Sequence, residues 1–137
     1  MTYSIREVAD RTGLPASTLR YYEAEGLLGP VPRAGGSRRQ YGEADLEWLS
    51  VIACLKNTGM PIQEIRRFVR LCDGGAATLE QRRAMLLAHQ AATEQHIAQL
   101  RRELKHIRAK VAYYQDACDA AEAGKPLPVG CAVRAKR

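Results

Sequence analysis

The feature that most constrains the fold is the stretch from Thr78 to Cys118, which contains neither glycine nor proline. Alanine, leucine, glutamine, glutamate, arginine and lysine dominate it, and these residues favour helix. Apolar or small side chains recur in it at alternating spacings of four and three residues: Thr93, Ile97, Leu100, Leu104, Ile107, Val111, Tyr114 and Cys118. This heptad pattern predicts one long helix with a single apolar seam.

A helix of about 40 residues spans on the order of 60 Å at 1.5 Å per residue. Residues 1–73 make too small a body to cover a seam of that length. We therefore expect the helix to pair with its own copy in a two-fold homodimer. The seam side chains expected in that interface are Ile97, Leu100, Leu104, Ile107, Val111 and Tyr114.

The start of the chain predicts two short helices separated by a tight turn. Ser4 and Glu7, three positions apart, form a capping-box pattern. Thr12-Gly13 ends the first helix, and Pro15 suits the first position of the second. Two short helices joined by a turn that contains glycine are typical of a helix-turn-helix.

The second of these helices carries side chains suited to reading DNA. If Leu19 and Tyr22 point inward, a period of 3.6 residues places Ser17, Arg20 and Tyr21 together on the opposite face. A hydroxyl, a guanidinium and a phenol can bond phosphate oxygens and base edges. This face is therefore the candidate DNA-reading surface.

The segment 29–41 is rich in turn formers and carries Arg33, Arg38 and Arg39 with no acidic residue, before ending in Tyr41. It predicts a β-hairpin wing that grips the sugar-phosphate backbone. A solvated loop is the alternative, but it leaves the arginine pair and the aromatic residue without a role.

Two further helices are expected before the long one. The third spans residues 43–57, with Leu49, Val51, Ile52 and Leu55 on its buried arc, and the fourth runs from Pro61 to Cys72. These complete a head over residues 1–73. Residues 119–137 are rich in glycine, proline and alanine and predict a flexible tail.

The net charge of +6 is less informative than its distribution. In residues 1–45, six arginines are balanced by six acidic residues, so only the wing segment is locally basic. There is no apolar run near the roughly 18 residues of a membrane span and no signal-peptide core, so we expect a cytoplasmic protein. In that compartment the four cysteines are expected to be reduced.

These motifs resemble the MerR family of bacterial transcription regulators over roughly residues 3–118. The resemblance rests on Thr-Leu-Arg-Tyr-Tyr-Glu at 18–23 followed by Gly26-Leu27-Leu28, on Arg39-Gln40-Tyr41, and on Thr-Gly-Met-Pro-Ile at 58–62. Two departures are Pro15, where relatives often carry a Ser or Thr cap, and the additional Arg38 before the wing arginine.

The resemblance implies a mainly α fold: a winged helix-turn-helix head with a small β wing, then a dimerisation helix over 78–118 that forms an antiparallel coiled coil. It implies a homodimer that binds a palindromic operator in promoter DNA and distorts it so that RNA polymerase can engage. No cofactor is expected. Carried over by residue, the contacts to DNA fall on Ser17, Thr18, Arg20 and Tyr21 in the groove, and on Arg38, Arg39 and Tyr41 at flanking phosphates.

Cys54 is the leading candidate for sensing an effector. On a helical wheel it lies beside Glu47 and Ser50, about 100° from Leu55 and off the apolar arc. The surrounding sequence resembles the branch of the family that responds to aldehydes, nitrosothiols and other electrophiles through one cysteine at this position. Such a thiol reacts as thiolate and needs positive neighbours. We expect these from the partner's long helix, among Arg101, Arg102, Lys105 and Arg108.

Two alternatives for the effector stay open. Cys118 and Cys131 could hold a soft metal ion such as Cu(I) or Zn(II), although no third ligand is evident. The cysteines could instead be structural, as expected of Cys72 on an apolar arc. His89 and His96 lie seven residues apart, about 10 Å along a helix, too far to share an ion within one chain. We expect both to face solvent beside the coiled coil.

Other classes of protein fit less well. An enzyme is not expected, because there is neither a glycine-rich phosphate loop nor a Ser/His/Asp constellation. A coiled-coil adaptor could use the same seam, but it would have no use for Arg20, Tyr21 and the arginine-rich segment.

Overall fold

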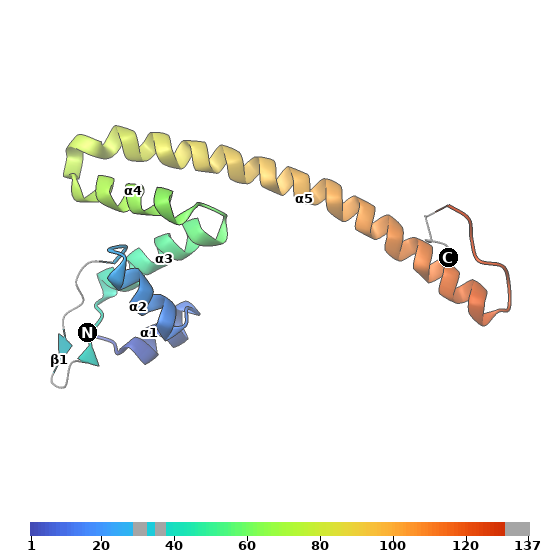
Figure 1. Ribbon diagram of the computed structural model, residues 1–137, viewed down its shortest axis with the longest axis horizontal. Helices are drawn as coiled ribbons and strands as arrows, with labels where there is room; N and C mark the ends of the chain where they lie inside the picture. The colour runs from blue at the N-terminus through green and yellow to red at the C-terminus, as the bar shows by residue number, and fades with distance from the viewer. Residues whose placement is uncertain (29–32, 35–37, 131–137) are drawn as a thin grey trace. The chain divides into compact units, whose positions relative to one another are not determined.

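The computed structural model describes residues 1–28, 33–34 and 38–130, with the backbone alone described at 33–34 and 38–39. The fold is mainly α-helical, as predicted (Figure 1). The helices are α1 (Ile5–Thr12), α2 (Ala16–Ala24), α3 (Glu43–Asn57), α4 (Ile62–Asp73) and α5 (Leu79–Glu122), with a 3-10 turn η1 (Gly75–Thr78) before α5. Two short strands, β1 (Arg33–Ala34) and β2 (Arg38–Arg39), pair antiparallel.

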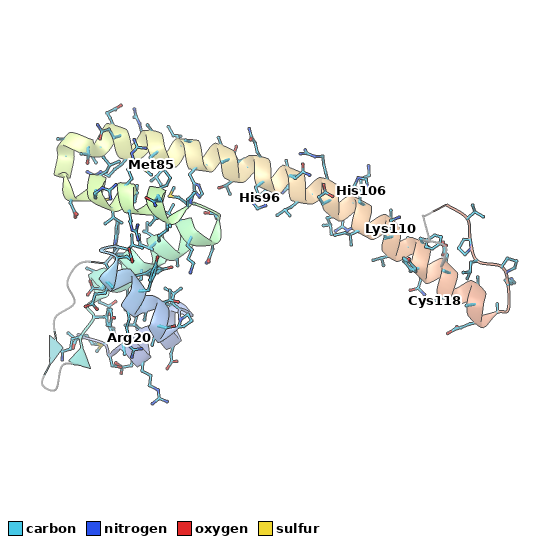
Figure 2. The ribbon with its side chains drawn as sticks, in the orientation of Figure 1. Arg20, Met85, His96, His106, Lys110 and Cys118 are labelled. Atoms are coloured by element: carbon cyan, nitrogen blue, oxygen red, sulfur yellow. The ribbon has the colours of Figure 1, made fainter. Side chains whose placement is uncertain are left out.

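The chain divides into two compact units, Met1–Gln90 and Ala91–Arg137. The division falls within α5, so the first turns of that helix belong to the unit that contains the head. There α4 and the start of α5 lie side by side (Figure 1), and Met85 packs against the head's core. Figure 2 shows the Met85 side chain on the side of α5 that faces α4.

Local signals set the helix starts. The Ser4 hydroxyl accepts from the Glu7 N–H at 3.2 Å and the Glu7 carboxylate accepts from the Ser4 N–H at 2.7 Å, which confirms the capping box. Pro15 and Pro61 are N-caps rather than first helical residues. Each has an extended ψ near 150°, at 149° and 148°, and its carbonyl accepts the first amides of the helix.

The core of the head is formed by the inward faces of α1 to α4. The largest fully buried side chains are those of Tyr22, Tyr41, Leu19, Leu27, Leu49, Ile52, Ile65 and Val8. Trp48 stacks on Phe68 with ring centroids 6.2 Å apart, and its indole N–H donates to the Leu27 carbonyl at 2.7 Å. The prediction that Val51 is buried is wrong. It is 40% exposed, because the buried arc of α3 steps through Leu49, Ile52 and Leu55.

Helix α5 continues to Glu122, four residues beyond the predicted end at Cys118. Residues 119–122 are Asp-Ala-Ala-Glu, which a helix tolerates well, and Gly124 then ends it with a left-handed φ of 67°. The Lys125 N–H closes the end on the Ala120 carbonyl at 2.8 Å. In the described part of the chain, no helix is long and apolar enough to cross a membrane.

Candidate nucleic-acid interface

Helix α2 presents one buried and one open face. Leu19 and Tyr22 are 0% and 2% exposed, whereas Ser17, Arg20 and Tyr21 are exposed and Thr18 is half-buried. Figure 2 shows the Arg20 side chain extending away from the neighbouring helices of the head. The arrangement that the helical period predicted for this helix is therefore confirmed. The open face offers a guanidinium, a phenol and hydroxyls to a ligand.

Tertiary contacts fix the end of α2. Gly26 has φ 74°, and the Leu27 N–H donates to the Tyr22 carbonyl at 2.9 Å, so the chain turns back into the core. Glu25 forms an ion pair with Arg66 of α4, and this contact ties the end of α2 to the fourth helix. A helix held in this way can present its open face without refolding on contact with a ligand.

Lys56, on the last turn of α3, is a cation beside α2 that the sequence analysis missed. Its Nζ lies 5.7 Å from the centroid of the Tyr22 ring. With Tyr21, Tyr22 and Met60 it lines a shallow pocket of about 250 Å³. The Tyr22 hydroxyl is buried and has no hydrogen-bond partner among the described residues. Lys56 and the exposed Tyr21 both line this pocket, at the edge of the α2 surface.

The arginine-rich segment forms a short antiparallel ladder in which Arg33 pairs with Arg39 and Ala34 with Arg38. Residues 29–32 and 35–37 lie outside the described part, as do the side chains of the four strand residues. The predicted contacts of Arg38 and Arg39 with phosphates therefore stay predictions. The ladder shows only that the backbones of the two strands pair antiparallel, so the wing also stays a prediction.

Tyr41 corrects one expectation. Its backbone bridges that of Tyr3, with N–H to carbonyl distances of 2.7 and 2.8 Å in the two directions. Its side chain is 0% exposed and belongs to the core. The prediction that this ring contacts flanking phosphates is therefore wrong. The bridge draws the residue inward, and burying an aromatic ring stabilises the head more than leaving it in solvent.

Cys54 is exposed on α3, off the buried arc, as the helical wheel predicted. It lines a groove of about 660 Å³ between α1 and α3, together with Arg11, Thr12, Glu47, Ser50 and Asn57. Arg11 is a cation of the same chain, whereas cations were expected only on a partner's long helix. It was missed because 43 positions separate Arg11 from Cys54 and only the fold brings them to one groove.

The rim of this groove is organised by Tyr3. The Arg11 guanidinium carbon lies 4.3 Å from the centroid of the Tyr3 ring. The Tyr3 hydroxyl donates to Glu43, and this hydrogen bond, with burial, raises the pKa of Tyr3 above its ordinary value. The groove thus combines an accessible thiol with a positioned cation and carboxylates.

Cys72 and Cys118 are not among the residues that line this groove. Cys72 packs partly against the core, and burial raises the pKa of its thiol above the usual range, although Arg82 acts in the opposite direction. Cys118 is exposed on α5, as Figure 2 shows, and Cys131 lies outside the described residues. Among the residues described, no three His, Cys, Asp or Glu side chains gather in a way that could hold a metal ion.

His89 and His96 differ in their exposure to solvent. His96 is exposed, as expected, but the prediction that His89 faces solvent is wrong. His89 is half-buried, and its Nε2 lies 2.6 Å from the Thr58 hydroxyl. The contact joins residues 31 positions apart, and nothing in the local sequence signals it.

This chain is similar to known regulatory proteins over most of its length. The model of the MerR HTH family of regulatory proteins matches residues 3–72, and the MerR DNA-binding model matches residues 46–120. An uncharacterised HTH-type transcriptional regulator of Haemophilus influenzae is 39% identical over 85% of this chain and 87% of its own. A probable heavy metal-dependent transcriptional regulator of the same organism is 30% identical over 84% of this chain and 87% of its own.

One solved structure is similar over nearly the whole chain. It is HiNmlR, described as a MerR family regulator lacking the sensor domain and bound to promoter DNA. The TM-score is 0.82 and the identity 38%, over 91% of this chain and 92% of that one. The fold of the present chain, the open face of α2 and the matches to two family models agree. The chain belongs to the MerR family of helix-turn-helix transcriptional regulators.

Proposed function

We propose that this MerR-family DNA-binding regulator acts as a homodimer on a palindromic operator in promoter DNA and responds to electrophiles through Cys54. The observation that carries the DNA-binding part is the open face of α2, with Ser17, Arg20 and Tyr21 exposed over a buried Leu19 and Tyr22. A related regulator of similar structure has been solved bound to promoter DNA. We also assign contacts with DNA to Thr18, Arg38 and Arg39.

The dimer is supported by the seam of α5. Each of its six central apolar side chains is at least 41% exposed in a single chain: Ile97, Leu100, Leu104, Ile107, Val111 and Tyr114. Monomeric proteins seldom leave a continuous apolar stripe of this kind in water. Pairing two copies in an antiparallel coiled coil covers it and sets two α2 helices a fixed distance apart. Half-sites one helical turn apart, about 34–36 Å, then meet both helices.

Promoter distortion is the proposed mode of regulation. When both α2 helices and both wings hold one duplex, a change in the angle between the heads bends or untwists the DNA between the half-sites. RNA polymerase contact elements on either side would thereby come into register. Regulation then acts through DNA shape, and it requires the state of the effector site to alter how the two heads are held.

Sensing by Cys54 is supported by its exposure and by the groove that it shares with Arg11. The thiolate is the reactive form of a cysteine. With formaldehyde, the sulfur would add to the carbonyl carbon. The π electron pair moves to the oxygen, which takes a proton from water, leaving an S-hydroxymethyl group. The similar regulator is described as lacking a sensor domain, which favours sensing chemistry in the head or in α5.

Substitution of Cys54 by serine tests this assignment. Because a serine hydroxyl does not form the adduct, Cys54→Ser should bind the promoter normally and lose induction by formaldehyde or a nitrosothiol. Reporter transcription with and without the electrophile measures the response, and gel shift measures the affinity. Cys118→Ser, also at an exposed thiol, is the matched control and should respond normally. Full induction in Cys54→Ser would show that the electrophile acts elsewhere.

The alternative effector is a soft metal ion held by Cys118 and Cys131. It is favoured by the similarity to a probable heavy metal-dependent regulator. Native mass spectrometry of the protein as purified, and again after Cu(I) or Zn(II) is added, distinguishes a metal effector from an electrophile. A bound ion that disappears in Cys118→Ser, together with metal-dependent transcription, would favour the metal and contradict the electrophile.

Lys56 gives a separate prediction about DNA. If its ammonium meets a phosphate beside α2, Lys56→Gln should weaken binding to promoter and bulk DNA alike. The slope of log affinity against log salt concentration should fall by about 1. Lys125→Gln, which removes the same charge near the end of α5, is the control. An unchanged salt slope in Lys56→Gln would remove this lysine from the interface.

A further inference from the structure

The last turn of α3 is linked to α5 through one hydroxyl group. The Cys54 carbonyl accepts the Thr58 N–H at 3.1 Å and lies 2.7 Å from the Thr58 Oγ1. The same Oγ1 lies 2.6 Å from Nε2 of His89. All of these atoms belong to the unit Met1–Gln90. A continuous path of hydrogen bonds therefore runs from the backbone of Cys54 to a side chain of α5.

The position of the proton on the His89 ring decides which group donates in each of these hydrogen bonds. A threonine hydroxyl has one proton to donate and can also accept. If His89 carries its proton on Nε2, it donates to the Thr58 oxygen, and the Thr58 hydroxyl still donates to the Cys54 carbonyl. Both bonds are then satisfied together. With a bare Nε2 the hydroxyl would have to donate either to His89 or to the backbone carbonyls of Cys54 and Leu55, so the arrangement favours the Nε2–H form.

The Thr58–His89 contact lies at a defined corner of the head. Thr58 caps α3 at a corner where Gly59 has φ 91° and the chain turns towards α4. On α5, Met85 packs against the core one turn before His89. Between α4 and α5 lies an open groove of about 520 Å³, lined by Met60, Arg67, Met85, Ala88 and His89. His89 therefore lines this groove, and its Nε2 also contacts Thr58 at the end of α3.

We propose that Thr58 and His89 are positioning residues that couple Cys54 to α5. The proposal rests on the function assigned to Cys54 above and names how its state reaches the dimerisation helix. An adduct on the Cys54 sulfur adds bulk to the last turn of α3, and a shift of that turn moves the carbonyl that holds the Thr58 hydroxyl. The bond to His89 then passes the shift to α5, whose angle to the head sets the separation of the paired α2 helices.

The test measures the response to formaldehyde in four full-length variants. Thr58→Val and His89→Leu remove the bond. Thr58→Ser keeps the hydroxyl, and His89→Gln keeps a nitrogen donor at a position close to Nε2. Promoter affinity and reporter transcription are measured with and without formaldehyde, and the melting temperature of each variant shows that it is folded.

We expect Thr58→Val and His89→Leu to bind the promoter like the parent protein, while the formaldehyde-dependent change falls by at least about fivefold. Thr58→Ser and His89→Gln should respond like the parent. The double variant of Thr58→Val and His89→Leu should lose no more than either alone, because one bond is broken in all three. If Thr58→Val does not fold, His89→Leu and His89→Gln carry the comparison.

The outcomes separate this inference from the proposed function. A full response in folded His89→Leu, beside a lost response in Cys54→Ser, overturns the coupling and leaves Cys54 as the sensor. A full response in Cys54→Ser overturns both. Equal losses in His89→Leu and His89→Gln also overturn the coupling, because the loss would then not depend on the hydrogen bond.

Discussion

Replacing Leu104 with aspartate is expected to convert the protein to monomers at micromolar concentration and to remove specific promoter binding. Leu104 lies in the middle of the α5 seam and is 41% exposed in a single chain. This exposed part of the side chain is available to a partner. Burial of a leucine side chain contributes about 1.5–3 kcal/mol. In a two-fold dimer each substitution is made twice, and each also places a carboxylate in an apolar contact.

The combined loss should raise the dissociation constant of the dimer by at least about a thousandfold, since each 1.4 kcal/mol is a factor of about ten. Operator binding should fall with it, because one head on one half-site retains little beyond the non-specific affinity. Analytical ultracentrifugation measures the first effect and gel shift the second. His106→Asp, on the exposed surface two residues away and off the seam, should remain dimeric. A dimeric Leu104→Asp would place the interface elsewhere.

Arg20→Ala should weaken promoter binding by about tenfold to a hundredfold while leaving the dimer intact, in line with the 1–3 kcal/mol of a base contact. Arg20 is exposed on α2 and extends away from the head (Figure 2), so its loss removes no packing within the chain. If the guanidinium reads a base, the ratio of promoter affinity to scrambled-sequence affinity should fall. If it meets only phosphate, both affinities should fall together.

The control for this substitution is Arg70→Ala, which removes an exposed arginine from α4 in the same unit. Fluorescence anisotropy at one fixed salt concentration, with promoter and scrambled duplexes, gives both affinities. Undiminished binding by Arg20→Ala at physiological salt would contradict the role assigned to the open face of α2.

Those parts of the fold that depend on neighbouring residues were predicted well. The bounds of α3, the Ser4–Glu7 capping box and the end of α1 at Thr12-Gly13 all follow from local chemistry, and the structure has each of them. The inward placement of Leu19 and Tyr22 follows from the helical period. The end of α5 was placed four residues early because Cys118 was the last member of the seam, whereas the helix ends only at Gly124.

Those parts of the site that depend on tertiary contacts were not predicted. Lys56 reaches α2 from the far end of α3, and Arg11 reaches the Cys54 groove from α1. Tyr41 was assigned to DNA for its place beside the arginines, but its bridge to Tyr3 takes it into the core. A helical wheel describes one element at a time, so it cannot show which side chains of two elements meet.

We propose that two copies, paired through α5, present two α2 helices to one operator. Native mass spectrometry of the protein on its promoter duplex, repeated on a duplex with about five base pairs inserted between the half-sites, tests it most directly, because that insertion rotates one half-site by about half a helical turn. We expect two chains on the natural duplex and loss of that complex on the altered one. A single chain per duplex, or equal occupancy of both duplexes, would contradict it.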